Sequence, residues 1–307
     1  MKSFDEIYAR VRELPQPKVA VAVAHDVEVL RAVCEAHRLG LASPVLFGNR
    51  RQMLEIASNN KLEISHFEMI DQPDDVMATY MAVDYVHRGK ADMFMKGVID
   101  TATFLRAVLD RKVGLRTESL LSHVAVFEIP RVDRLVYVTD VAFVSYPTLS
   151  EKVALISNAC SVARVCGIDC PRVAPLAAVE VVNPKMQATV DAAKLTEMCT
   201  KGQIKGCVVD GPLSFDLAMF PDAAQHKQSA DRQIVGDADI LLVPNIEAGN
   251  ILYKCLAGLT DSRCGGILAG TKAPVVLTSR SDSAATKIDS IALAALAAKT
   301  DKRKKKL

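Results

Sequence analysis

The fold is decided by three consecutive pieces of sequence, KVAVAVAHD (18–26), VEVLRAVCEAHRLG (27–40) and SPVLFGN (43–49). The first and third pieces are short apolar runs, and the middle piece places its apolar residues at helical spacing. A buried strand, a helix and a second buried strand in succession predict a mostly parallel sheet with helices on both faces. We therefore expect an α/β protein.

The same alternation continues along the chain. A strand is expected at ADMFMKG (91–97) and a helix at TATFLRAVLDRK (101–112), followed by strands at HVAVFEI (123–129) and RLVYVTD (134–140). The pattern restarts at TLSEKVALISNACSVARVCG (148–167), which begins with a Thr/Ser cap signal. Further strands are expected at RVAPLAAVE (172–180), CVVDGP (207–212), ADILLVPN (238–245), GGILAG (265–270) and APVVLTS (273–279), with helices at 185–202, 247–258 and 281–298. Two α/β units meet near Ser145–Pro147.

Composition excludes several classes of protein. Of 307 residues, 50% are hydrophobic and 24% are charged, which is a globular ratio, and the net charge is +2. The last nine residues, KTDKRKKKL, hold six basic groups, so the remaining chain is slightly acidic and does not indicate nucleic-acid binding. No apolar run approaches the ~20 residues of a membrane span. The charged start, MKSFDEIYARVRELPQP, is unlike a signal peptide, and we expect a cytoplasmic location without membrane contact.

The eight cysteines are expected to be reduced thiols of the core. None forms a C-x-x-C pair, and the nearest approach to a zinc motif, Cys166-Gly-Ile-Asp-Cys170, is wrongly spaced and has no second half. We therefore expect no metal site.

Candidate binding loops follow the expected strands, because ligands of open α/β sheets bind where the strands end. Four regions are rich in Gly, Ser, Thr, Asp or Asn: MKGVIDTATFLR (95–106), TDVAFVSYP (139–147), VDGPLSFD (209–216) with LVPNIEAGNILYK (242–254), and VLTSRSDS (276–283). Neither G-x-G-x-x-G after the first strand, nor a P-loop, nor G-x-S-x-G is present. Such loops suit a site that positions an anionic substrate and stabilises charge.

These same loops resemble a known family. The stretches KGVIDTATFLRAVLDRKVGLRTESLLSHVAVFE (96–128), VNPKMQATVDAAKL (182–195), GQIKGCVVDGPLSFDLA (202–218), GDADILLVPNIEAGNILYK (236–254) and APVVLTSRSDS (273–283) are similar to the phosphate acetyltransferase and phosphate butyryltransferase family. The resemblance runs in order from about Lys18 to Ala298. It is strongest to the butyryltransferase branch, through SHVAVFE, VEVVNPKM and VLTSRSDS.

The resemblance implies a fold and a reaction. The family interconverts acyl-CoA and orthophosphate with acyl phosphate and free CoA, so CoA is a substrate and no cofactor is expected. Its fold has two α/β/α domains of the isocitrate/isopropylmalate-dehydrogenase type with a cleft between them. We expect residues 1–144 and 274–307 to form the first domain, residues 145–273 to form an inserted second domain, and the chain to assemble as a homodimer or higher homo-oligomer.

The resemblance also implies catalytic residues. A Ser-Arg pair lines the family's active site, and here it is Ser279-Arg280. Attack of phosphate on a thioester makes an oxyanion that a hydroxyl can stabilise, and a guanidinium holds phosphate with paired hydrogen bonds. Thr286 stands where the acetyl branch has an aspartate proposed as base. Asp282 is then the nearest carboxylate, with two alternatives open: it caps the last helix, or local cations favour the CoA thiolate without a base.

Further substrate-binding residues are expected on both sides of the cleft. For phosphate and substrate these are Arg106, Lys96, Thr101, Thr103, Ser122, His123 and Asp140. For the CoA side they are Asp210, Gly211, Pro212, Gly249 and Asn250. One departure stands beside Asp140: Val144 replaces an asparagine that the family usually has.

Two other functions stay open. A CoA-binding or acyl-phosphate-binding protein without activity is consistent with Val144 and Thr286. A metal- and NAD-dependent decarboxylating dehydrogenase of the same scaffold needs a divalent metal held by several carboxylates, a Tyr/Lys acid–base pair and a nicotinamide site, and the chain shows no cluster of Asp at i, i+4 near a strand end.

Overall fold

The computed structural model describes residues 1–226, 232–278 and 282–304, with side chains up to residue 298. The backbone forms two compact units. We call Phe4–Ser119 with Arg263–Leu307 the split unit, and Leu120–Ser262 with Met1–Ser3 the inserted unit.

The split unit contains a helix-covered sheet with strand order β3-β2-β1-β4-β11-β10. From β3 to β11 the neighbouring strands are parallel, and β10 and β11 are antiparallel. Its strands are β1 (Lys18–Ala22), β2 (Ser43–Gly48), β3 (Glu68–Asp71), β4 (Met93–Lys96), β10 (Arg263–Ala269) and β11 (Val275–Val276). Its helices are α1 (Phe4–Arg12), α2 (Val27–Arg38), α3 (Arg50–Asn59), α4 (Asp75–His87), α5 (Thr101–Val108) and α11 (Ala284–Lys304).

The order of strands in the split unit creates a topological switch point. The chain adds β2 and β3 on one side of β1 and then returns to add β4 on the other side. Successive connections therefore diverge between the carboxyl ends of β1 and β4, which leaves a crevice there. Open α/β sheets bind their ligands at such a crevice.

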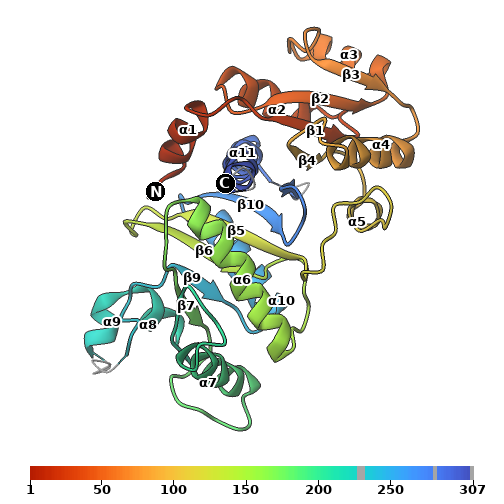
Figure 1. Cartoon of the computed structure of the whole chain (residues 1–307). Coiled ribbons are helices and arrows are strands. Elements are labelled where there is room, and N and C mark those ends of the chain that lie inside the picture. Colours follow the sequence, from red (N-terminus) through yellow and green to blue (C-terminus); the bar gives the residue numbers. More distant parts are fainter. Residues whose placement is uncertain (227–231, 279–281, 305–307) are drawn as a thin grey trace. The chain divides into compact units, whose positions relative to one another are not determined.

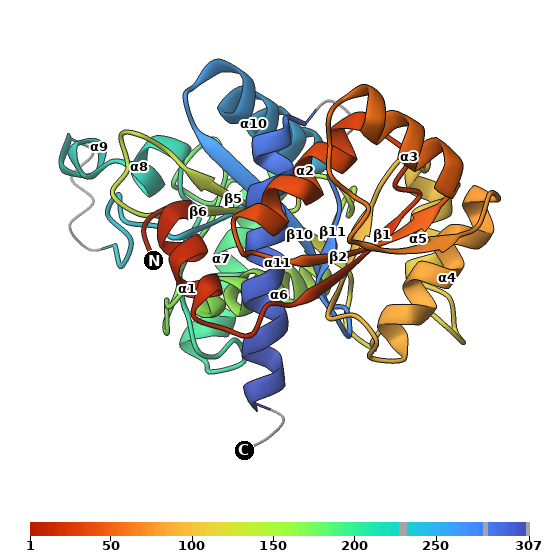
Figure 2. The same ribbon diagram turned by 90° about the horizontal axis from the view of Figure 1, so that it is seen from above.

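Helix α11 forms the centre of the split unit. Ile288, Ile291 and Leu296 are buried, and so are Leu293 and the alanines between them, so that residues 291–296 are at most 2% exposed. In Figure 2 α11 runs between α1 and α2, and it also packs on β10. A helix segment that is apolar on all sides belongs to the core of the protein.

The strands of the inserted unit follow the order β5-β6-β9-β7-β8 (Figure 1). The β5–β6 pair is antiparallel and the pairs β6–β9, β9–β7 and β7–β8 are parallel. Its strands are β5 (Ser122–Glu128), β6 (Leu135–Thr139), β7 (Arg172–Pro175), β8 (Val208–Val209) and β9 (Ile240–Leu242). Its helices are α6 (Leu149–Val165), α7 (Gln187–Thr200), α8 (Phe215–Met219), α9 (Pro221–His226) and α10 (Ile246–Leu259).

The unit boundaries lie at 119/120 and 262/263, whereas the sequence placed domain boundaries at 144/145 and 273/274. Strand pairing accounts for part of the difference. β6 pairs with both β5 and β9, which brings residues 122–139 into the same sheet as residues 240–242. The residues around Pro147 precede a helix and do not mark a boundary between units. Thr148 and Glu151 form a capping box at the start of α6.

Candidate active site

A pocket of about 230 Å³ lies at the switch point of the split unit. Segments that follow three strands form it, and one residue of α11 joins them. Its lining residues are Asp26, Glu28, Val29, Lys96, Gly97, Val98, Thr278 and Lys287. Because β1, β4 and β11 are neighbouring parallel strands, their carboxyl ends all meet at this edge.

Gly97 allows the ends of β1 and β4 to approach one another. Its amide donates to the carbonyl of Ala22 at 2.8 Å, and the next amide donates to the carbonyl of Val23 at 2.9 Å. A Cβ at position 97 would lie 2.2 Å from the Val23 oxygen and 2.3 Å from the Ala22 oxygen. Only glycine fits this approach, and Val23 itself has a positive φ of 53°, which is unusual for a β-branched residue.

The pocket contains two buried lysines. Lys96 and Lys287 are each 5% exposed. The Lys96 ammonium donates to the carbonyl of Gly97 at 3.3 Å, and the Lys287 ammonium donates to the carbonyl of Asp282. Both bonds are to backbone carbonyls.

The pocket also contains two carboxylates, those of Asp26 and Glu28. The Asp26 carboxylate caps α2 by accepting from the Val29 amide at 3.0 Å, and Glu28 is exposed. The lining thus holds two buried ammonium groups and two carboxylates, and the ammonium groups can pair with an anion such as phosphate.

The first turn of α11 supports Lys287. The Ser283 hydroxyl accepts from the Thr286 amide at 3.1 Å, which is a helix N-cap bond. The Thr286 hydroxyl lies 3.1 Å from the Ser283 hydroxyl and 3.6 Å from the Cys264 thiol. The cap that the sequence allowed for Asp282 is thus provided by Ser283. The expected catalytic pair Ser279-Arg280 lies outside the described residues, directly after Thr278.

Thr101, Thr103 and Arg106 lie on α5, which starts four residues after β4. Asp100 caps the helix by accepting from the Thr103 amide at 2.8 Å, and contacts with Thr103 lower the pKa of the Asp100 carboxyl. Arg106 is exposed, and its guanidinium donates to the Thr103 hydroxyl at 2.7 Å. Arg106 is therefore oriented by its own helix.

The other predicted site residues belong to the inserted unit. Ser122 is fully buried and its hydroxyl accepts from the Asn158 amide group at 2.8 Å. Asp140 is 2% exposed, and its carboxylate accepts from the backbone amides of His123, Ala142 and Phe143, each at 2.8 Å. Asp140 therefore connects the turn after β6 to the start of β5.

Gly249 and Asn250 fix the same turn from α10. A Cβ on Gly249 would lie 2.3 Å from the carbonyl oxygen of Asp140, so α10 can pack there only with glycine. The Asn250 side chain donates to the Val141 carbonyl at 3.1 Å. Both contacts are with protein backbone.

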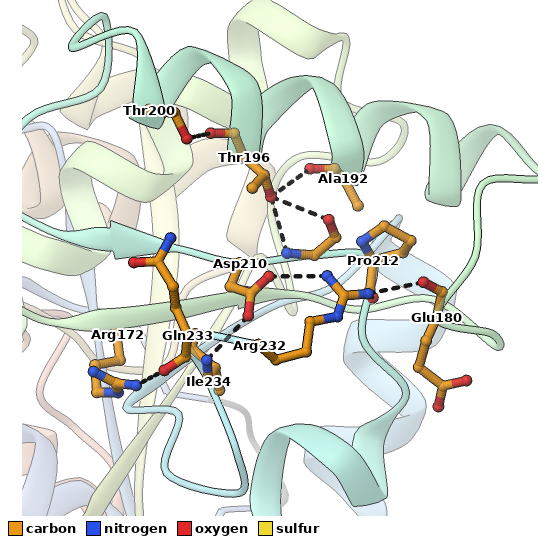
Figure 3. Close-up of polar contacts among 11 residues, drawn as sticks. Arg172, Glu180, Ala192, Thr196, Thr200, Asp210, Pro212, Arg232, Gln233 and Ile234 are labelled. Atoms are coloured by element: carbon orange, nitrogen blue, oxygen red, sulfur yellow. Dashed lines mark hydrogen bonds and ion pairs between the residues drawn. The ribbon is translucent and has the colours of Figure 1, made fainter. Parts of the chain in front are cut away.

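Asp210, Gly211 and Pro212 lie in a network of polar contacts, shown in Figure 3. The Asp210 carboxylate, 5% exposed, pairs with the Arg232 guanidinium at 2.9 Å and accepts from the Ile234 amide at 3.0 Å. Arg232 also donates to the carbonyls of Glu180 and Pro212, each at 2.8 Å. This network connects the end of β8 to residues 232–234 and to the loop at Glu180.

Gly211 is held from α7. Its amide donates to the Thr196 hydroxyl at 2.9 Å, and that hydroxyl in turn donates to the Gly211 carbonyl at 3.1 Å (Figure 3).

Three residues were not predicted from the sequence: Thr278 and Lys287, which line the pocket, and Arg232, which pairs with Asp210. Thr278 stands in a loop that the strand-end rule selected, but nothing singled it out among its neighbours. Lys287 reads as an ordinary helical lysine, and its only signal is its position one turn into the helix after VLTSRSDS. Arg232 carries no local signal, because its partners are distant in sequence.

The described residues contain no group of three or more His, Cys, Asp or Glu side chains arranged to hold a metal ion. Among the helices within residues 1–226, 232–278 and 282–304, none combines the length and apolar character needed to cross a membrane.

Comparison with known proteins adds independent information. Residues 76–295 match the family described as "Phosphate acetyl/butaryl transferase". The chain is 54% identical over 301 residues to the phosphate butyryltransferase of Clostridium beijerinckii, covering 98% of this chain and 99% of that protein. It is 43% identical over 279 residues to the phosphate acetyltransferase of Thermotoga maritima, covering 91% and 94%.

A solved structure agrees with this similarity. A branched-chain phosphotransacylase from Enterococcus faecalis V583 superimposes with a TM-score of 0.82 at 33% identity, covering 92% of this chain and 99% of that one. The α/β fold that the sequence predicted is confirmed.

Proposed function

This chain belongs to the phosphate acetyl/butyryl transferase family, and from that membership we propose that it transfers a short-chain acyl group between CoA and orthophosphate, with butyryl preferred over acetyl. The products in one direction are acyl phosphate and free CoA. Greater identity to the butyryltransferase, 54% against 43%, supports the preferred acyl group.

The observation that carries the proposal is the pocket with Lys96 and Lys287 at the switch point, which leads in sequence directly into Ser279-Arg280. Orthophosphate is an anion, and the tetrahedral oxyanion formed when it attacks a thioester carbonyl is another. Buried cations held in place before the reaction stabilise both, because they need no reorganisation as charge develops.

We assign roles accordingly. Lys96, Lys287 and Arg280 hold phosphate, Ser279 donates to the oxyanion, and Arg106 with Thr101 contacts substrate at the start of α5. The phosphate oxygen forms a bond to the acyl carbon, the C–S bond breaks, and CoA leaves as the thiolate or thiol. Asp140, Gly249, Asn250 and the Asp210 network shape the inserted unit's loops, and CoA contacts from these loops remain a prediction. We propose that the enzyme needs no resident cofactor.

The experiment is an assay of CoA release from butyryl-CoA and from acetyl-CoA in the presence of phosphate. We expect turnover of both, with a higher kcat/KM for butyryl-CoA, since each methylene contributes about 1–3 kcal/mol of discrimination. An acetyl preference above a hundredfold would contradict the butyryl assignment. Binding of butyryl-CoA without CoA release would instead identify a non-catalytic CoA-binding protein.

One substitution, Asp282→Asn, tests whether a carboxylate deprotonates the CoA thiol. If the Asp282 carboxylate deprotonates the CoA thiol, Asp282→Asn should slow acyl-phosphate consumption by about 10²–10⁴-fold with little change in KM. If cations favour the thiolate, the loss stays under tenfold and the rate rises with pH toward the titration of the thiol. Since Ser283 already caps α11, loss of a cap cannot explain a large effect of Asp282→Asn.

A cytoplasmic location and a homo-oligomeric state are part of the proposal. Light scattering on the purified protein tests the second.

A further inference from the structure

The switch-point pocket of the split unit has apolar side chains beside its charged groups. Of the described residues that line it, only Val29 and Val98 have apolar side chains. An acyl phosphate has the same mixed character, because one carbonyl group joins its anionic phosphate to an apolar chain. The lysines of the pocket are assigned to phosphate, so the valines are the described lining residues that suit the chain.

The two valines differ in how much of their surface is already covered. Val29 is 3% exposed and belongs to the buried face of α2. Val98 is 39% exposed, although Gly97 and Ile99 on either side of it are buried. Single exposed valines are common on protein surfaces, and what distinguishes Val98 is its place in the lining of this pocket. A ligand that covers this valine gains free energy by removing apolar surface from water.

The backbone holds Val98 in place on both sides. Its amide donates to the Val23 carbonyl at 2.9 Å, and the Gly97 amide donates to the Ala22 carbonyl at 2.8 Å. Two residues later, Asp100 caps the start of α5. A branched side chain on a fixed backbone has few rotamers, so little conformational entropy is lost when a ligand packs against it.

Val98 is also close in the chain to one of the lysines assigned to phosphate. It follows Lys96 by two residues, so the two Cα atoms are at most about 7 Å apart. The carbonyl carbon of an acyl phosphate is bonded directly to a phosphate oxygen, and the chain continues from that carbon. Butyryl extends beyond acetyl by two further carbons, and a phosphate held by Lys96 and Lys287 can bring these two carbons to Val98.

Resting on the proposed function, we propose that Val98 is a specificity-determining residue that contacts the acyl chain and gives butyryl its advantage over acetyl. The two outer carbons of butyryl cover the exposed surface of Val98 and displace water from it. Acetyl is too short to do so and leaves this surface in water. Val98 takes no part in forming or breaking a bond, so transfer of acetyl does not depend on it.

The first test makes the contact polar without changing its shape. Val98→Thr keeps the branched side chain and exchanges one methyl group for a hydroxyl. The kcat/KM values are measured with acetyl-CoA, propionyl-CoA and butyryl-CoA at saturating phosphate. We expect the butyryl-to-acetyl ratio of kcat/KM to fall about tenfold, with the value for acetyl-CoA within about threefold of wild type. An unchanged ratio would overturn the proposal.

Val76→Thr is the matched control. Val76 is a 49% exposed valine on α4 of the same unit, and it does not line the pocket. The same exchange should leave the butyryl-to-acetyl ratio unchanged there. An equal fall of the ratio in both variants would contradict a specific contact at Val98.

A larger side chain tests the same contact by its volume. Val98→Phe should fill part of the 230 Å³ pocket and lower kcat/KM at least about tenfold more for butyryl-CoA than for acetyl-CoA. The KM for phosphate should stay close to that of the wild type, and thermal unfolding shows whether each variant is folded. A raised KM for phosphate with an unchanged acyl preference would place Val98 against phosphate and overturn the proposal.

Titration calorimetry separates a failure of this inference from a failure of the proposed function. Without phosphate no acyl transfer occurs, so dissociation constants of acetyl-CoA and butyryl-CoA can be measured whether or not the enzyme turns over. If the wild type releases no CoA, the proposed function is wrong, and a binding preference for butyryl-CoA that Val98→Thr loses still supports the contact. Equal affinities in the wild type, or a preference that Val98→Thr retains, would overturn the contact.

An active enzyme that prefers acetyl-CoA is a different outcome. The butyryl assignment is then wrong, and the contact stands only if Val98→Thr lowers kcat/KM more for butyryl-CoA than for acetyl-CoA. Equal losses with both substrates would overturn it.

Discussion

Charged side chains are buried in both units, but their neighbours differ. In the inserted unit the Asp210 carboxylate is matched by Arg232 and a backbone amide, so its charge holds loops together. At the switch point of the split unit, Lys96 and Lys287 donate to carbonyls beside a pocket. Both regions carry sequence motifs of the same family. Buried charge thus holds loops together in the inserted unit and borders a cavity in the split unit.

The largest expected effect is that of Lys96→Met. Loss of this cation should lower kcat/KM by about 10³-fold, which is about 4 kcal/mol of transition-state stabilisation. The free energy of unfolding is measured beside activity, so that a loss of activity is separated from a loss of folded protein. Steady-state kinetics and urea unfolding measure both quantities. The matched control is Lys152→Met, which removes a buried lysine of the inserted unit and leaves Asp191 unpaired, so that it should lose stability instead. If the two variants have similar kinetics, a buried lysine beside the pocket is no more important for activity than one in an ion pair of the inserted unit.

Arg280→Lys should come next, with a loss of about 3 kcal/mol in transition-state binding and a raised KM for phosphate. The positive charge survives this substitution, but a single ammonium cannot form two parallel hydrogen bonds to one phosphate. Phosphate saturation curves measure the change. Wild-type kinetics in a folded Arg280→Lys protein would remove Arg280 from the site.

Arg232→Met tests the other side of the comparison. Leaving Asp210 buried without its partner should lower the free energy of unfolding by about 2 kcal/mol, discounted because the Arg232 side chain is 25% exposed. Activity per folded molecule should stay within about threefold. Arg10→Met, which breaks an exposed pair with Glu13, is the control and should change stability by under about 0.5 kcal/mol. A tenfold rise in the KM for acyl-CoA, at full stability, would instead place Arg232 and Asp210 against the substrate.

The smallest expected effect is that of Ser283→Ala. Loss of the α11 cap should cost about 1 kcal/mol of stability and should lower activity several-fold, because the first turn of α11 holds Lys287. Thr148→Ala removes the cap of α6 and should cost similar stability without the loss of activity. Thermal unfolding and steady-state kinetics are measured for both variants. Equal losses of activity in Ser283→Ala and Thr148→Ala would contradict a specific role of the α11 cap in holding Lys287.

Sequence predicted the parts of this molecule that depend on local pattern. The buried runs at 18–26 and 91–97 became β1 and β4, the Thr148 cap signal became the start of α6, and the strand-end rule selected Lys96. Short elements with weak patterns, α1, β3, α8 and α9, were not predicted. The strand expected at 172–180 ends at Pro175, the last residue that pairs with β9.

Side-chain contacts that depend on the tertiary structure could not be predicted from local pattern. Ser279, Ser281, Asp282 and Ser283 are all plausible caps in sequence, and only the geometry of the turn selected Ser283. Arg232 finds Asp210 through loop packing, at a separation of 22 residues. The Asp140 carboxylate, predicted to bind substrate, accepts from the amide of His123 on β5 and from the amides of Ala142 and Phe143 in its own turn, and the contact with β5 has no local signal in the sequence.

The discontinuity of the split unit has a consequence for how the chain is made. Residues 4–119 emerge from the ribosome long before β10, β11 and α11, which complete their sheet and core. At roughly 5–20 residues per second, synthesis of residues 120–262 alone takes about 7–30 s. During that interval the apolar surfaces of α1 and α2 that α11 later covers stay open to water or to a chaperone. Helix α11, which carries Lys287, is also the helix that covers these surfaces. Completion of the pocket and burial of the apolar surfaces of α1 and α2 therefore occur in the same step of folding.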